Sequence, residues 1–234
     1  MDQQIIIRVA DSGDIHYATT ITDEMEASAK ARGTGIAKRS PDYVAQKMQE
    51  GKAVIAVTTD GAWVGFCYIE AWGHEKFVAN SGLIVSPEFR KSGVAKQIKK
   101  RIFELSREKY PDAKIFGLTT GLAVMKINSE LGYEPVTYSE LTDDEDFWKG
   151  CKACVNYDIL MSKGRKNCLC TAMLFDPAEH VQKVEEKAED KIVNAKLLER
   201  FLDIKQSRLL KLLKKKDFAN KEKTKSIINY FLSL

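Results

Sequence analysis

The chain has 234 residues, of which 44% are hydrophobic and 30% charged, and its formal net charge is +4. This composition describes a soluble globular protein with room for one good core and an appendage. No apolar run is long enough to span a membrane, the N-terminus shows no secretory signal, and so small a charge gives little reason to expect a nucleic-acid partner. Five cysteines without an export signal suggest reduced thiols, so we expect a cytoplasmic protein.

The first part of the chain predicts a strand and two helices joined by a basic loop. β-Branched residues indicate the strand, and capping residues followed by apolar residues at helical spacing indicate the helices. Ser40 and Pro41 mark the start of the second helix, because Ser caps a helix and Pro fits its first position. The expected elements are a strand over 5–10, a helix over 14–31, a loop over 32–39 and a helix over 40–51.

The middle of the chain predicts a hairpin followed by alternating strands and helices. Asp60-Gly61 is a strong hairpin turn between two apolar runs. The expected elements are strands over 53–58, 63–71, 78–85 and 114–119, helices over 94–110 and 122–131, an extended piece over 135–138, and last strands over 156–161 and 169–174. Val94, Ile98, Ile102 and Leu105 share one face of the first of these helices. The pattern is that of an α+β fold with a mixed sheet.

The tail from Pro177 has a different composition, with 14 Lys or Arg and 9 Asp or Glu residues. Its apolar residues recur at three- and four-residue spacing, which predicts an amphipathic helix. A solvated helix face is the plain interpretation. A dimer contact or a contact with an anionic surface are the alternatives.

The turn between the strand over 78–85 and the next helix is suited to binding an anion. The first N–H groups of a helix have no partner inside it, and the helix dipole there favours negative charge. Gly93 lets the backbone approach a bulky group, and Arg90 and Lys91 add positive charge. The spacing is neither that of a Walker loop nor that of a dinucleotide-binding loop. The predicted pyrophosphate cradle consists of Arg90, Lys91, Ser92, Gly93, Val94 and Ala95.

The pattern R-x-x-G-x-A between an apolar strand and an amphipathic helix resembles the acyl-CoA signature of the GNAT superfamily of N-acetyltransferases. The resemblance covers roughly residues 5–161. It implies a GNAT-like mixed, mostly antiparallel sheet with a splayed central parallel pair, flanked by helices, which we assign to a domain over 1–175. The composition assigns residues 176–234 to a C-terminal amphipathic helical tail. The resemblance also implies that acetyl-CoA, or another acyl-CoA, is the cosubstrate, and that its pantetheine arm pairs with the backbone of Leu83, Ile84 and Val85.

Direct transfer of an acyl group to an amine needs a base, a polarised carbonyl and a proton for the departing thiolate. Glu70 is the preferred base, because burial of a carboxylate in an apolar strand is costly and therefore indicates a functional role. The alternatives are that Glu70 faces solvent or that water relays the proton. Members of the family often place an acidic Tyr where this chain has Asn128, which can hydrogen-bond the CoA arm but cannot supply a proton. Tyr68 and Tyr157 are the substitutes, and either could equally be a core tyrosine.

The basic loop bears on the acceptor. In the family, the link between the first two helices overhangs the acceptor site, and here it carries Arg32, Lys38 and Arg39. Because arginine pairs well with carboxylates, we expect a small-molecule amine, preferably an amino acid such as glutamate; a solvated loop is the alternative. The rival functions are protein or peptide N-acetylation and a non-catalytic regulatory module that binds CoA. A homodimer through a sheet edge or the tail helix is a further option.

Four of the five cysteines form two close pairs in the sequence, Cys151 with Cys154 and Cys168 with Cys170. Four thiolates could bind zinc tetrahedrally, and basic residues lie nearby. The second pair has a single residue between its members, which is not a usual zinc-knuckle spacing. Small buried thiols on strands are therefore the favoured interpretation, and no metal is expected.

Overall fold

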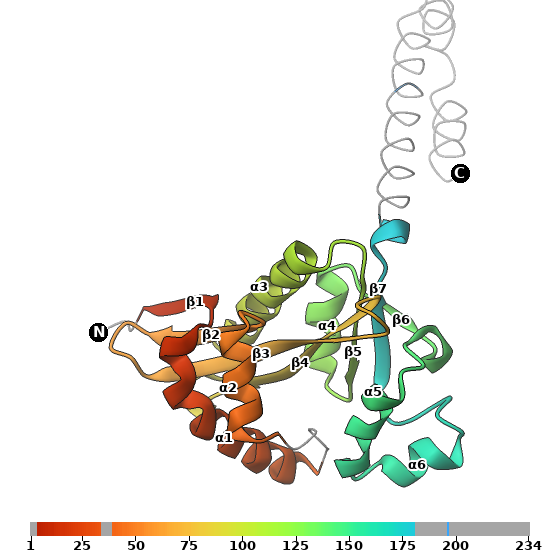
Figure 1. Ribbon diagram of the computed structural model, residues 1–234, viewed down its shortest axis with the longest axis horizontal. Helices are drawn as coiled ribbons and strands as arrows, with labels where there is room; N and C mark the ends of the chain where they lie inside the picture. The colour runs from red at the N-terminus through yellow and green to blue at the C-terminus, as the bar shows by residue number, and fades with distance from the viewer. Residues whose placement is uncertain (1–3, 34–38, 181–195, 197–234) are drawn as a thin grey trace, which may run out of the picture. The chain divides into compact units, whose positions relative to one another are not determined.

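The structure, a computed structural model, is built on one seven-stranded sheet with the strand order β1-β2-β3-β4-β5-β7-β6 (Figure 1). It describes residues 4–33, 39–180 and 196. The strands are β1 (Ile5–Val9), β2 (Ala53–Thr58), β3 (Trp63–Trp72), β4 (Phe77–Val85), β5 (Lys114–Thr119), β6 (Glu134–Val136) and β7 (Thr171–Phe175). Neighbouring strands pair antiparallel except β4 and β5, which pair parallel. The predicted mixed sheet is therefore confirmed.

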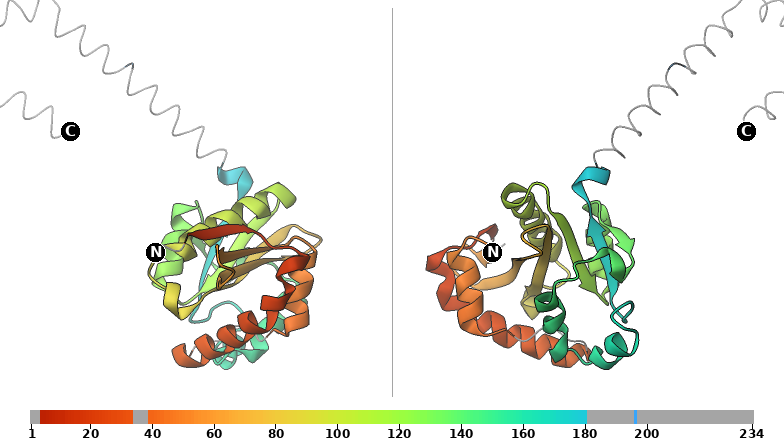
Figure 2. Two further views of the ribbon diagram at one scale, coloured as in Figure 1. Left: turned by 90° about the vertical axis from the view of Figure 1, so that its left-hand side faces the viewer. Right: turned by 45° about the vertical axis from the view of Figure 1, so that its right-hand side comes forward.

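Helices cover both faces of this sheet. The α-helices are α1 (Ala18–Arg32), α2 (Pro41–Gln49), α3 (Val94–Lys109), α4 (Leu122–Glu130), α5 (Glu145–Lys149) and α6 (Tyr157–Ser162). Short 3₁₀ helices are η1 (Ser12–Tyr17), η2 (Pro87–Phe89), η3 (Tyr138–Glu140) and η4 (Gly150–Ala153). In Figure 2 the green helices α3 and α4 lie on one side of the sheet and the red and orange helices α1 and α2 on the other. Among the described helices, none is both long and apolar enough to cross a bilayer.

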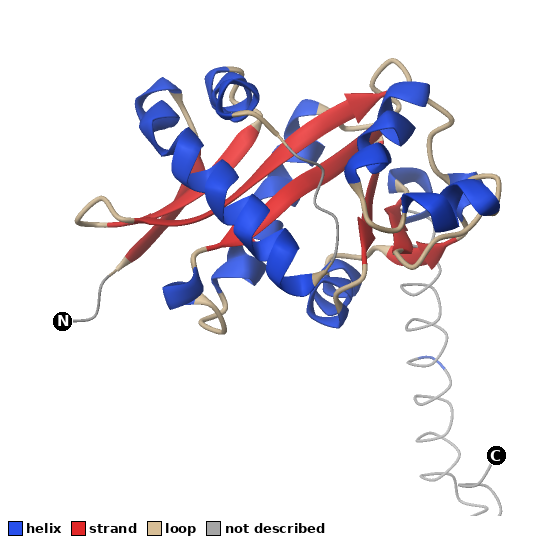
Figure 3. Ribbon diagram, turned by 90° about the horizontal axis from the view of Figure 1, so that it is seen from below, coloured by secondary structure: helices blue, strands red, loops and turns tan. Residues whose placement is uncertain are grey.

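Alternation along the strands divides the core into layers. On β3, Cys67 and Ile69 pack under α3, whereas Phe66 and Tyr68 pack under α1 and α2. The predicted apolar face of α3 is buried in the first of these layers. A third cluster, around Trp148, covers the β5–β7 part of the sheet with α5 and α6. Figure 3 shows the α1 and α2 side from below, with its helices lying across the strands.

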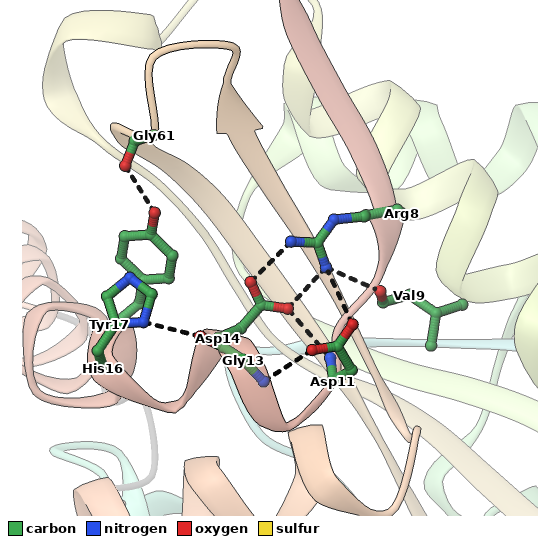
Figure 4. Close-up of polar contacts among 8 residues, drawn as sticks. All are labelled: Arg8, Val9, Asp11, Gly13, Asp14, His16, Tyr17 and Gly61. Carbon is green, nitrogen blue, oxygen red and sulfur yellow. Dashed lines mark hydrogen bonds and ion pairs between the residues drawn. The ribbon is translucent and has the colours of Figure 1, made fainter.

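A carboxylate network fixes the start of the first helical region (Figure 4). Asp11 accepts a hydrogen bond from Gly13 N at 2.7 Å. Asp11 and Asp14 also form a capping box, in which the Asp11 side chain accepts from Asp14 N and the Asp14 side chain accepts from Asp11 N at 3.0 Å. Arg8 on β1 binds both carboxylate oxygens of Asp14, at 2.6 and 2.8 Å. The network holds a 3₁₀ turn, so the α-helix begins at Ala18 rather than near residue 14 as expected.

One predicted strand is wrong. Residues 156–161, expected to be extended, form α6 instead. Leu160 is buried in the third cluster, while Ile159 and Met161 on either side of it are exposed. A short apolar run of this length fits a strand or a helix turn equally well, and packing against Trp148 and its neighbours decides the outcome.

Candidate functional site

The two central parallel strands separate before they end. β4 pairs with β5 at Phe77↔Lys114, Val78↔Ile115 and Ala79↔Phe116, and at no later residue. β4 nevertheless continues to Val85, and the second half of β5 pairs with β7 on its other edge. The edge of β4 over residues 80–85 thus faces the edge of β5 over residues 117–119 without pairing with it. An extended molecule with amide groups could hydrogen-bond between them.

A β-bulge lies in β4 within this unpaired segment. Opposite β4, Phe66 pairs with Ile84 and Tyr68 with Ser81, so that one residue of β3 faces Gly82 and Leu83 of β4. Gly82 has a φ of +64°, and a Cβ there would lie 2.3 Å from Cε1 of Tyr68. Only glycine fits, and the bulge turns the local amide groups away from the regular ladder. Leu83, Ile84 and Val85, the predicted cofactor strand, are the part of β4 that follows this change of direction.

The chain passes from β4 through η2 to the start of α3. Gly93 is the N-cap, with a φ of +85°, and no side chain caps the helix. In the described part of the chain, the first helix amide to find a backbone acceptor is that of Lys96, which donates to Gly93 O at 3.1 Å. The amides of Val94 and Ala95 precede it. Among the described residues, this helix terminus thus leaves its first amides without a backbone acceptor, which is the arrangement that the predicted anion site requires.

The cationic residues of the turn have different positions. The Arg90 guanidinium does not extend from the turn but binds Glu24 at 2.5 Å and Ser28 at 2.8 Å on α1, and its Nε donates to Val85 O at 3.1 Å. Arg90 thus ties the end of β4 to α1. Lys91 is exposed, with a φ of +65°, and Ser92 donates its hydroxyl proton to Phe89 O at 2.6 Å.

Asn128 on α4 lies on the β5 side of the gap. Its side chain is 1% exposed and would lie 3.7 Å from a Cβ at Gly117, the first residue of β5 that has no partner on β4. Nδ2 is 3.8 Å from Met173 Sδ. Among the described residues Oδ1 has no hydrogen-bond partner. A buried carbonyl oxygen of this kind has the capacity to accept a hydrogen bond from a ligand amide.

On the opposite face, Glu70 is the centre of a polar cluster. It is 7% exposed, so the solvent-facing alternative is wrong. Its Oε1 accepts a hydrogen bond from Tyr43 on α2 and pairs with Arg39 Nη2 at 3.0 Å. Arg39 Nε also donates to the Tyr68 hydroxyl at 3.0 Å. Because the Tyr68 ring packs against Gly82, this cluster lies beside the bulge.

The two phenols of the cluster are held in their protonated form. Burial, followed by the hydrogen bond and charge of Glu70, raises the pKa of Tyr43 far above its usual value of 10. Burial and the Glu70 charge likewise raise the pKa of Tyr68. Lys47 lies over the Tyr43 ring at 4.9 Å, and burial lowers the pKa of its ammonium group. The cluster thus holds protonated phenols close to a carboxylate.

Sequence reasoning located some of these residues and missed others. Glu70, Tyr68 and Arg39 come together, whereas Tyr157 lies on α6 in the cluster around Trp148. Lys38 and the side chain of Arg32 lie outside what the structure describes. Tyr43 was not predicted, because its position after the Ser40 cap indicates only a helix start.

A cavity of about 510 Å³ lies elsewhere, at the beginning of β4 and β5. Phe77 and Lys114, where the parallel pairing starts, are among its lining residues, together with Tyr110 at the end of α3. None of the residues of the gap, the bulge or the Glu70 cluster lines it. Its size alone does not connect it with the chemistry described above.

Residues 23–124 match the family model described as the acetyltransferase (GNAT) family. A search of the curated proteins found no match. Among solved structures, N-acetylglutamate synthase from Neisseria gonorrhoeae, complexed with coenzyme A and N-acetyl-glutamate, is 19% identical with a TM-score of 0.52. The match covers 75% of this chain and 36% of that one, so the chain spans about a third of that protein.

Two further structures match over nearly their whole length. A Mycobacterium tuberculosis protein in complex with CoA is 17% identical, with a TM-score of 0.51 and 73% and 98% of the two chains covered. The yncA protein of Salmonella typhimurium, with its cofactor acetyl-CoA, is 14% identical, with a TM-score of 0.51 and 74% and 94% covered. Likeness at these identities shows the fold, which is the GNAT fold.

Proposed function

We propose that this chain carries an acetyltransferase domain of the GNAT family and that it moves an acetyl group, or a related acyl group, from acyl-CoA directly to the amine of a small molecule. The observation that carries this proposal is the open start of α3 next to the gap between β4 and β5. An anion site at one end of an unpaired strand edge suits a ligand with a diphosphate and an amide-containing arm.

The cosubstrate side of the site uses mostly backbone. The amides of Gly93, Val94 and Ala95 bind the diphosphate, with the exposed Lys91 nearby. The pantetheine arm runs along Leu83–Val85, and Asn128 Oδ1 accepts a hydrogen bond from one of its amides. The orphaned oxygen of Asn128 supports this arrangement, since such a ligand would satisfy it.

The chemical step uses the cluster on the other face. The neutral amine nitrogen attacks the thioester carbonyl, and Glu70, directly or through a water molecule, takes the proton that the nitrogen loses as the C–N bond forms. A backbone N–H of the β4 bulge stabilises the oxyanion. The C–S bond breaks, and Tyr68 gives its proton to the departing thiolate. The Tyr68 phenol is protonated at neutral pH, because burial raises its pKa, and its contact with Gly82 places it beside the bulge.

The acceptor is an amino acid in this proposal, with glutamate preferred. Arg39, at the end of the loop between α1 and α2, supports a carboxylated substrate, because a guanidinium can bind more than one carboxylate oxygen. Arg32 and Lys38 of the same loop would add to the positive charge. One of the structures with this fold, N-acetylglutamate synthase, contains N-acetyl-glutamate.

The test is release of CoA thiol from acetyl-CoA with a panel of amino acids, neutral amines and lysine peptides. The proposal expects turnover with a carboxylated amine, and expects Arg32→Ala to raise the KM for that amine with little change in the KM for acetyl-CoA. Equal activity on neutral amines would remove the carboxylate hypothesis. Preference for peptides would favour protein acetylation, and binding of CoA without turnover would favour a regulatory module.

A further inference from the structure

Four cysteines gather in one place in the segment that joins β6 to β7. Only Cys67 lies on a strand, so the expectation of buried thiols on strands is wrong for the other four. Cys151 is in η4, Cys154 is the residue that ends it, and Cys168 and Cys170 precede β7. All four line one cavity of about 30 Å³. Two pairs of cysteines that are at least 14 positions apart in the sequence thus line a common space.

A tight turn and an N–H···S hydrogen bond hold the first pair of cysteines. Cys154 N donates to Cys151 O at 2.9 Å and closes a tight turn between the two. Asn156 N donates to Cys154 Sγ at 3.4 Å. An N–H that points at a sulfur atom stabilises a thiolate, and such outer hydrogen bonds orient metal ligands.

Two other residues that line the cavity contact the second pair. The Tyr138 hydroxyl donates to Cys170 O at 2.9 Å, and the Cys168 thiol donates to Asn156 O with Sγ at 3.8 Å. Leu169 between them is 62% exposed while both cysteines are half-buried, so the two side chains turn inward together. The single-residue spacing that seemed unfavourable in the sequence therefore does place both sulfur atoms on one side.

The surroundings suit a cation held by thiolates. A divalent ion with four thiolates has a net charge of about −2, and the exposed Lys152, Lys163 and Lys166 lie in the same segment. The segment also lacks long helices, since α6, with six residues, is the longest between β6 and β7. Small units with little regular structure commonly depend on a metal or disulfides.

We propose that Cys151, Cys154, Cys168 and Cys170 together bind one structural zinc ion. In the described residues no three potential ligands already converge on a metal position. Binding therefore requires side-chain rotation that brings each sulfur to about 2.3 Å from the ion. Zn²⁺ takes the place of the four thiol protons, which pass to solvent, and no electron is transferred. The site holds the β6–β7 segment together and is separate from the acyl-transfer chemistry.

The test is the metal content of the full chain, purified under reducing conditions without added metal or chelator. We expect about one zinc per chain in the wild type and about tenfold less in Cys154→Ser and Cys170→Ser. Cys67→Ser is the matched control, because this fifth cysteine lies outside the cavity, and it should retain the zinc. If a variant does not fold, the zinc content of the wild type still tests the proposal. After chelation, Co²⁺ should give a thiolate charge-transfer band that saturates at about one equivalent.

Three results would overturn the proposal. One is a metal-free protein that binds neither Zn²⁺ nor Co²⁺ after chelation. Another is the presence of iron and sulfide in place of zinc. The third is an intact mass that shows disulfides among these cysteines in protein purified under reducing conditions.

Discussion

Asn128 has a buried carbonyl oxygen that makes no hydrogen bond within the described part of the chain. An unsatisfied buried acceptor costs about 1–3 kcal/mol of stability, and a protein retains it where a ligand uses it. Because the resemblance to the GNAT superfamily leads us to expect an acidic tyrosine at this position, Asn128 is central to the question of catalysis. Removal of this oxygen should therefore weaken ligand binding without destabilising the free protein.

Replacement of Asn128 by Leu should therefore weaken acetyl-CoA binding and leave the free protein as stable or more stable. We expect the Kd for acetyl-CoA to rise about tenfold, for the loss of one hydrogen bond, and the urea midpoint not to fall. Asn80 is the matched control, because it is also buried but has both partners, Ser106 Oγ at 2.7 Å and the Tyr133 hydroxyl at 3.0 Å. Asn80→Leu should lower the midpoint. A lower midpoint for Asn128→Leu would show that its role is structural.

Glu70 is held by two donors, so its role in proton transfer must be separated from its role in positioning. Glu70→Gln should lower kcat about 10²–10⁴-fold with the KM for acetyl-CoA changed less than about twofold. Tyr43→Phe is the control, because it removes one donor to the same oxygen and leaves the carboxylate with Arg39. If Glu70→Gln keeps kcat within about fivefold, water carries the proton and Glu70 only positions Arg39 and Tyr43.

At the level of elements, the bulge in β4 and the start of α3 both depend on glycine, for different reasons. A methyl at Gly82 would overlap Tyr68, whereas a Cβ at Gly93 would meet nothing within 4 Å. Gly82→Ala should thus destabilise the fold by about 2–4 kcal/mol. Gly93→Ala should cost about 1–2 kcal/mol, from its positive φ alone.

Among variants that fold, the loss of affinity for acetyl-CoA should be larger for Gly93→Ala than for Gly82→Ala. Gly93→Ala should raise the Kd for acetyl-CoA about tenfold, since the helix amides would turn from their positions. Urea unfolding and calorimetric titration with acetyl-CoA measure the two effects. A Gly93→Ala variant with wild-type affinity would contradict a diphosphate site at this terminus.

The Asp14 network at the start of the first helical region makes stability depend on pH. Burial opposes ionisation of Asp14, but the hydrogen bonds from Arg8 and Asp11 outweigh it, and the pKa lies below its usual 3.8. The unfolded chain therefore binds a proton at Asp14 more readily than the folded chain does. The stabilisation that Asp14 provides is complete above its pKa in the unfolded chain, and it is lost as pH falls through its pKa in the folded chain.

Asp14→Asn should accordingly lower the free energy of unfolding by about 1–3 kcal/mol near pH 7. The difference from the wild type should shrink at about pH 3, where the carboxylate is protonated in the unfolded chain. Urea unfolding at both pH values checks this. A difference of the same size at both would show that the charge of Asp14 is not what stabilises the helix start.

Local patterns predicted the elements that carry their own signals. β2 and β5 have the expected limits, the Ser40 cap opens α2, and the glycine turn opens α3. The helix α6 was predicted as a strand, because a short apolar run has no periodicity that separates the two. The pairing of Arg90 with α1 and of Tyr43 with Glu70 could not be predicted either. Both depend on tertiary packing between segments distant in the sequence.

Over the whole molecule, the two faces of the sheet have separate tasks in this account. The side with α3 and α4 offers amides and the Asn128 oxygen to the cosubstrate, and the side with α1 and α2 offers Glu70, Tyr68 and Arg39 to the acceptor. The gap between β4 and β5 joins them. The boundary between this domain and the tail, placed near residue 175 from composition, stays a prediction.

A crystal structure of the protein with bound CoA tests the central claim most directly. We predict the diphosphate at the amides of Gly93, Val94 and Ala95, and the pantetheine arm between residues 80–85 of β4 and 117–119 of β5. Asn128 Oδ1 should lie within about 3 Å of a pantetheine nitrogen. CoA bound elsewhere, with the start of α3 left without a ligand, would contradict the account.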